Sequence, residues 1–180
     1  MSLWEKWKKS REKVGDKGVN TPFLTSPDFE GTLVLKVCSV RAKKSEAKEN
    51  AMGDPVIYHV ANMEVMSHVP SGSAKSVPEG TKVSFVKGDD TVYNVRDIGN
   101  FTAALCQMHP NALDSADGAA LMEELWAGGE GNGTEFKDQR LIVAEVKPRT
   151  SKKNSTFHNA TFYPCDDNGE RLALHELQDL

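Results

Sequence analysis

The sequence predicts a mainly β protein, built as a five-stranded barrel with a helical insertion between its third and fourth strands. Five segments show the alternation of apolar and polar residues that a half-buried strand requires. Between the third and fourth of these segments, the apolar spacing changes to the three- and four-residue steps of a helix. A chain of 180 residues is long enough for one domain with a core and short for two.

The first expected strand begins at Gly31 and organises the rest of the chain. Leu33, Leu35 and Val37 fall on one of its faces, at the period of two that a pleated strand requires. The strand runs directly into residues 41–48, which we expect to form a basic loop. The cations of this loop are Arg41, Lys43, Lys44 and Lys48.

The second and third expected strands follow at residues 56–66 and 81–87. The second is rich in β-branched and aromatic residues, and a Gly-Asp-Pro turn at residues 53–55 precedes it. It is therefore expected to form a long hairpin with the first strand. Residues 67–80 contain prolines, glycines and serines and predict a long loop. In the third strand, Phe85 is expected to lie in the core.

A helical pattern occupies residues 92–108, and a second helical piece follows at residues 114–127. The last two expected strands are residues 140–146 and 156–164. They are joined by a basic turn, residues 147–155, which contains no acidic residue. The cations of this turn are Lys147, Arg149, Lys152 and Lys153.

This order of elements is that of the oligonucleotide/oligosaccharide-binding (OB) fold. In that fold the face of strands 2 and 3 and the loops 1–2 and 4–5 bind the ligand. The two basic segments occupy those two connections, so we expect them to flank one face of a closed barrel. Cations there would hold a phosphate backbone, and aromatic rings between them would stack on bases.

Four aromatic residues are candidates for such stacking. Phe85 is favoured as core, and Tyr58 is the preferred platform because its hydroxyl group tolerates a half-wet site. The candidates are Tyr58, Phe85, Phe157 and Tyr163. The residues predicted to contact nucleic acid are Lys36, Arg41, Lys43, Lys44, Lys48, Tyr58, Lys82, Arg149, Lys152, Lys153 and Phe157.

The charge is distributed unevenly along the chain. Residues 166–180 hold five acidic residues and one basic residue, which accounts for the whole formal net charge of −4. The remainder is neutral with basic patches, and a local patch sets the potential that a ligand meets. We therefore divide the chain into a basic arm or helix (residues 1–20), an OB domain (21–165) and an acidic tail (166–180). Trp4 and Trp7 of the arm either cover apolar surface or stack along a polyanion.

Six segments between residues 21 and 164 carry a further pattern. They read GTLVLKVCSVRAKK, VIYHVANMEV, GTKVSFV, NVRDIGNFTAAL, RLIVAEVKPRT and NATFYP. Together they resemble a family of bacteriophage single-stranded DNA-binding proteins with an OB fold. The resemblance implies a protein, not an enzyme, that coats and protects single-stranded DNA during phage replication and recombination, largely without sequence preference. It implies no cofactor and no metal.

The resemblance also bears on the acidic tail. Bacterial proteins similar to this family often end in an acidic tail with a hydrophobic tip that recruits replication and repair enzymes. The ending HELQDL implies a similar recruitment of replication or recombination proteins. Leu172, Leu174 and Leu177 could instead form a short helix packed on the body.

Two other functions stay open. Asp89, Asp90 and Asp97 could bind Mg²⁺ in a metal-dependent nuclease. Against this, an Asp pair after Gly88 is ordinary turn chemistry, and no His, Lys or Glu accompanies it at a recognisable spacing. The second of these functions is that of a protein-interaction barrel with no nucleic-acid role.

Composition indicates where the protein acts. No apolar run is long enough to span a membrane, and the first residues lack the apolar middle of a signal peptide. Three widely spaced cysteines suit reduced thiols. We therefore expect a cytoplasmic protein, in the host cytoplasm if it is phage-encoded, with no membrane partner. Whether it forms a homo-oligomer is left open.

Overall fold

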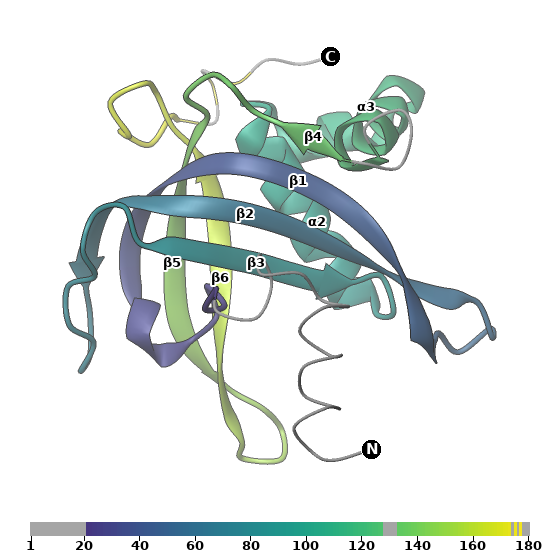
Figure 1. Ribbon diagram of the computed structural model, residues 1–180, viewed down its shortest axis with the longest axis horizontal. Coiled ribbons are helices and arrows are strands. Elements are labelled where there is room, and N and C mark those ends of the chain that lie inside the picture. Colours follow the sequence, from purple (N-terminus) through teal and green to yellow (C-terminus); the bar gives the residue numbers. More distant parts are fainter. Residues whose placement is uncertain (1–20, 128–132, 174, 176, 178–180) are drawn as a thin grey trace, which may run out of the picture.

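A computed structural model of the chain describes residues 21–127, 133–173, 175 and 177 (Figure 1). Within these residues the fold is mainly β, with one antiparallel six-stranded sheet and two α-helices. The strands are β1 (Gly31–Glu49), β2 (Pro55–Pro70), β3 (Lys82–Gly88), β4 (Thr134–Glu135), β5 (Leu141–Thr150) and β6 (Thr156–Pro164). The helices are α2 (Val92–Leu105) and α3 (Ala116–Ala127), with 3-10 turns η1 (Pro27–Phe29) and η2 (Pro110–Asp114). The predicted arm, residues 1–20, lies outside the described residues.

The strand order is β3-β2-β1-β5-β6, and the short strand β4 pairs with β1. Figure 1 shows β1 and β2 sweeping across the molecule, with β5 and β6 crossing behind them. In the described part of the chain β3 and β6 are the two ends of the sheet and do not pair, so the closed five-stranded barrel predicted from the sequence is not formed. Helix α2 contacts both end strands.

The opening of the sheet is filled by an aromatic cluster centred on α2. Phe101 is fully buried, and its ring centroid lies 5.4 Å from that of Phe85, 5.0 Å from that of Phe162 and 5.6 Å from that of Trp126. The indole N–H of Trp126 donates to Thr102 Oγ1 at 3.0 Å, which satisfies a buried polar group and ties α3 to α2. The core position predicted for Phe85 is confirmed. Apolar packing by α2 thus takes the place of a strand pairing.

Three strands are longer than the sequence predicted. The strand β2 continues to Pro70, so residues 67–70 belong to it and not to the loop predicted at residues 67–80. Residues 41–48 belong to β1 and not to a loop, and Arg149 belongs to β5. The register places Lys43 opposite Tyr58 and Arg149 opposite Phe157. Residues 41–48 are mostly exposed and carry few apolar side chains, so the alternation that marks a strand is absent from this part of the sequence. The connecting loops are residues 50–54 and 151–155.

The start of the acidic tail folds back onto the sheet. The amide N–H of Leu172 donates to the carbonyl of Pro164 at 3.0 Å. The guanidinium of Arg171 lies 3.2 Å from the ring centroid of Tyr163 and donates to Glu145 at 3.5 Å. Tyr163 is therefore stacked against Arg171, which leaves it poorly placed to stack on a base.

Cys38, Cys106 and Cys165 are free thiols, as their spacing predicted. Burial raises the pKa of the Cys165 thiol to about 11, and the neighbouring carboxylates of Asp166 and Asp167 add to the rise. None of the helices in the described part of the chain has the length and apolar character needed to cross a bilayer.

Candidate nucleic-acid interface

Of the predicted binding residues of β1 and β2, Arg41, Lys43 and Tyr58 lie on the face of the sheet that points away from the core. Lys44, in contrast, is opposite Ile57 and alternates to the other face. Side chains directly opposite each other on paired strands share a face. Val40 and Ala61 form one such pair and are buried. The next pair, Arg41 and Val60, therefore points to the other side, which we call the outer face of β1, β2 and β3. Val86 of β3 lies opposite Val60 and continues this face.

A groove of about 630 Å³ is hollowed in the outer face near the end of the β1–β2 hairpin. Lys43 and Lys44 are exposed at its edge, and Tyr58 is half-buried beside them. Val60 and Val86, also half-buried, supply an apolar floor. We call this the hairpin groove. It combines two ammonium groups, which attract phosphate, with an aromatic ring and aliphatic side chains, which attract the faces of bases. The exposed carboxylate of Glu46 also lines the groove and offsets one of the two positive charges.

The hairpin groove brings together three of the predicted site residues, Lys43, Lys44 and Tyr58, and Arg41 follows on the same face. Val60 and Val86 were not among the residues predicted from the sequence to line the site. They alternate along their strands with the core residues Ala61 and Phe85. The alternation in the sequence therefore indicated that both valines face outwards.

Two other predicted cations are close to a carboxylate. Lys82 forms an ion pair with Glu64, and Lys36 lies opposite Glu64 in the neighbouring strand. The hydrogen bond from Lys82 lowers the pKa of the Glu64 carboxyl group, and the charge of Lys36 adds a smaller effect. This end of the outer face therefore carries two cations around one acid, and the ammonium group of Lys82 is already engaged within the protein.

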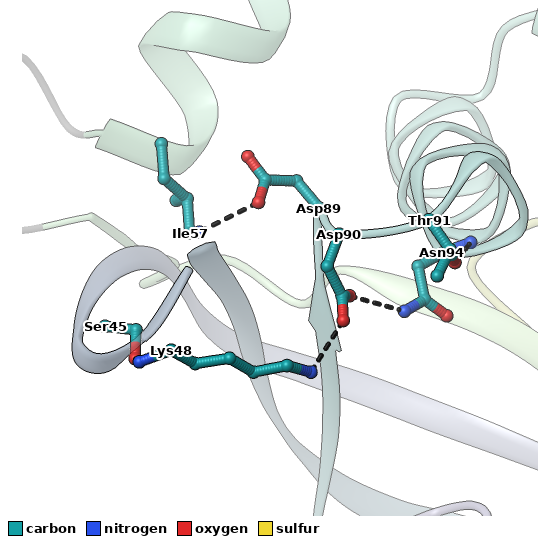
Figure 2. Close-up of polar contacts among 7 residues, drawn as sticks. All are labelled: Ser45, Lys48, Ile57, Asp89, Asp90, Thr91 and Asn94. Atoms are coloured by element: carbon teal, nitrogen blue, oxygen red, sulfur yellow. Dashed lines mark hydrogen bonds and ion pairs between the residues drawn. The ribbon is translucent and has the colours of Figure 1, made fainter. Parts of the chain in front are cut away.

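Lys48 links the β1–β2 hairpin to the start of α2 through Asp90 (Figure 2). Its Nζ lies 2.6 Å from Asp90 Oδ2, and Asn94 donates its side-chain amide to the other oxygen at 3.1 Å. Asp89 accepts the backbone N–H of Ile57 at 2.8 Å and returns its own N–H to the Ile57 carbonyl at 3.0 Å. The ammonium predicted to bind DNA is thus engaged within the protein.

The three carboxylates of the nuclease alternative have separate roles in the structure. Asp89 and Asp90 join the hairpin to the start of α2, whereas Asp97 forms a 2.9 Å ion pair with Lys87. Among the described residues, no group of three or more His, Cys, Asp or Glu side chains could hold a metal ion.

Lys48→Ala is expected to raise the pKa of Asp90 toward its ordinary value of 3.8, because the Lys48 hydrogen bond is the largest cause of the lowered pKa. The stabilisation from Asp90 is complete above pH 3.8 and is lost as the pH falls through the lower folded-state pKa. Carboxyl titration by NMR measures the shift. Lys44→Ala, which removes a charge from the same strand without breaking the pair, is the control. Equal Asp90 titrations in both variants would contradict this assignment.

The second basic region lies at the β5–β6 end. Lys152 and Lys153 are exposed in the loop, and Phe157 is 50% exposed. The register pairs Gly31 with Val146, so this hairpin leaves the sheet at the start of β1, whereas the β1–β2 hairpin ends at its other end. Figure 1 shows the two ends projecting in different directions, at the bottom and at the right.

Comparison of the chain with protein-family models, with curated proteins and with solved structures finds no match.

Proposed function

We propose that this protein binds single-stranded DNA along the outer face of β1, β2 and β3 and coats it largely without sequence preference. The hairpin groove is the observation that carries this proposal, because Lys43 and Lys44 stand beside the Tyr58 ring over an apolar floor. Ammonium groups release counterions from phosphates, and a ring stacks on any base. Neither interaction reads sequence.

A half-buried ring favours single strands over duplexes. The bases of a duplex are stacked on one another, so their faces are closed to a protein side chain. In a single strand the faces are open, and stacking on an aromatic residue contributes about 1–3 kcal/mol per base. Tyr58 lines the hairpin groove and is half-buried there, so an unpaired base could stack on it.

The strand order supports an OB-type fold as part of the proposal. The order β3-β2-β1-β5-β6 with α2 between β3 and β5 agrees with that fold in every pairing except the last, which would join β3 to β6. We propose that α2 replaces that pairing and that the protein is a relative of the phage single-strand binders it resembles, acting in replication or recombination.

Titration of a labelled oligonucleotide tests this function. Single-stranded and duplex DNA and RNA are compared at about 50 and 200 mM salt, where binding through phosphates differs strongly. We expect single-stranded DNA to bind more tightly than duplex, to weaken with salt and to remain intact when Mg²⁺ is added. Negligible binding at low salt would favour a protein-interaction domain, and degradation with Mg²⁺ would favour a nuclease.

A further inference from the structure

A second cavity, of about 290 Å³, lies between α2 and β6. Arg96 and Asn100 line it from α2, where residues four apart share a face. Asn159 and Thr161 line it from β6, and Arg149 reaches it from β5. We call it the α2–β6 cavity. Its polar groups come from three elements and converge on a space that holds no protein side chain.

The charge of the α2–β6 cavity is positive. Arg96 and Arg149 each contribute a guanidinium group, which remains charged at any physiological pH. The carboxylate in the lining is that of Asp97, and the ammonium of Lys87 lies 2.9 Å from it. These two side chains are only 11% and 18% exposed, so they neutralise each other inside the protein. The two arginines therefore give the cavity lining its net positive charge.

The lining groups suit a phosphate. A guanidinium presents a planar fork of N–H donors that matches two phosphate oxygens. The side-chain amide of Asn100, half-buried at the wall, is a further donor. Asn159 and Thr161, also half-buried, are the polar residues of β6 that border the cavity. A group with several acceptor oxygens and a negative charge satisfies these donors together.

Two exposed rings lie beside the arginines. Arg96 lies over the Tyr93 ring, 5.7 Å from its centroid, and Tyr93 is 72% exposed. Phe157 is opposite Arg149 in the register and shares its face of β6 with Asn159 and Thr161. Rings beside a phosphate site suit a nucleotide strand, whose bases flank each phosphate. A free phosphate ion would make no use of them.

We propose that the α2–β6 cavity binds a backbone phosphate of single-stranded DNA through Arg96 and Arg149, while Tyr93 and Phe157 stack on neighbouring bases. This inference rests on the proposed function and extends it. Helix α2 begins at the hairpin end, where Asp90 binds Lys48, and carries Arg96 in its second turn. A DNA strand could thus continue from the hairpin groove along α2 to the cavity. This path would connect the two basic regions, which lie at opposite ends of β1.

The test compares Arg96→Ala, Arg149→Ala and the double variant with wild type in salt-dependent titrations. Each loss of a charged hydrogen bond to phosphate is expected to weaken binding of a long single strand about ten-fold at low salt. The slope of log K against log salt should become shallower by about 0.7 for each variant, as expected for one lost phosphate contact. A short oligonucleotide that fills only the hairpin groove should bind all variants equally.

Lys137→Ala is the matched control, because it removes one exposed cation from the segment between β4 and β5. Both arginines are exposed, and thermal melting checks that the variants fold. Arginine variants that bind the long strand like Lys137→Ala would overturn the inference and leave the proposed function standing. Wild-type protein that binds no single strand would overturn both.

A separate titration distinguishes the source of the phosphate. Inorganic phosphate is added to wild-type protein, and the arginine side-chain NMR signals are followed. We expect no saturable shift at millimolar phosphate, because the rings contribute only to a strand. A saturable shift that the double variant abolishes, with unchanged DNA binding, would assign the cavity to a free anion and overturn the inference.

Discussion

Replacing Phe101 with Ala is expected to lower the free energy of unfolding by about 3–5 kcal/mol, the range for truncating a buried aromatic side chain. Phe101 is 0% exposed and contacts the rings of Phe85, Phe162 and Trp126. These rings come from β3, β6 and α3, so the cavity would open where α2 bridges the two ends of the sheet. Urea denaturation followed by circular dichroism measures the change.

Val92→Ala is the control for this prediction, because it shortens an apolar side chain in the same helix that is 83% exposed. Its effect should stay within about 0.5 kcal/mol. A loss at Phe101 as small as that at Val92 would mean that α2 does not close the sheet by packing. The proposed binding surfaces would then not depend on the packing of α2 across the two ends of the sheet.

Replacing Tyr58 with Ala is expected to weaken the binding of single-stranded DNA about ten- to hundred-fold, as removal of one base-stacking ring does. Tyr58 is half-buried in the hairpin groove, with Lys43 directly opposite it. Because stacking releases no counterions, the salt dependence should stay the same. Substituting Lys43 and Lys44 together should instead make the slope shallower by about 1.4, the value for two phosphate contacts on a single strand.

Tyr58→Phe is the matched control, since it keeps the ring and removes only the hydroxyl group, and it should bind like wild type. Thermal melting shows whether each variant is folded. Folded Tyr58→Ala protein with full affinity would remove Tyr58 as a stacking platform. A shallower salt slope in that variant would mean that it had disturbed the neighbouring lysines.

The apolar periodicity of the chain is enough to assign core residues of the sheet. Alternation along β1 and β3 identified Leu33, Leu35 and Phe85 as core, and all three are buried. The helix between the third and fourth predicted strands was visible for the same reason, since burial on one side leaves a period in the apolar residues. Lys43, Lys44 and Tyr58 could be named because the turn of a single hairpin brings them together.

Contacts between residues distant in the sequence follow only from how the elements pack in three dimensions. This packing placed Lys48 on Asp90 and Lys82 on Glu64, left the sheet open, and brought Arg96 and Arg149 to one cavity. No local pattern records these contacts, because each depends on how elements distant in sequence are packed. The charged end of β1 has no period either, since it carries few apolar side chains. Periodicity reveals which side of an element is buried, and only packing reveals what lies against it.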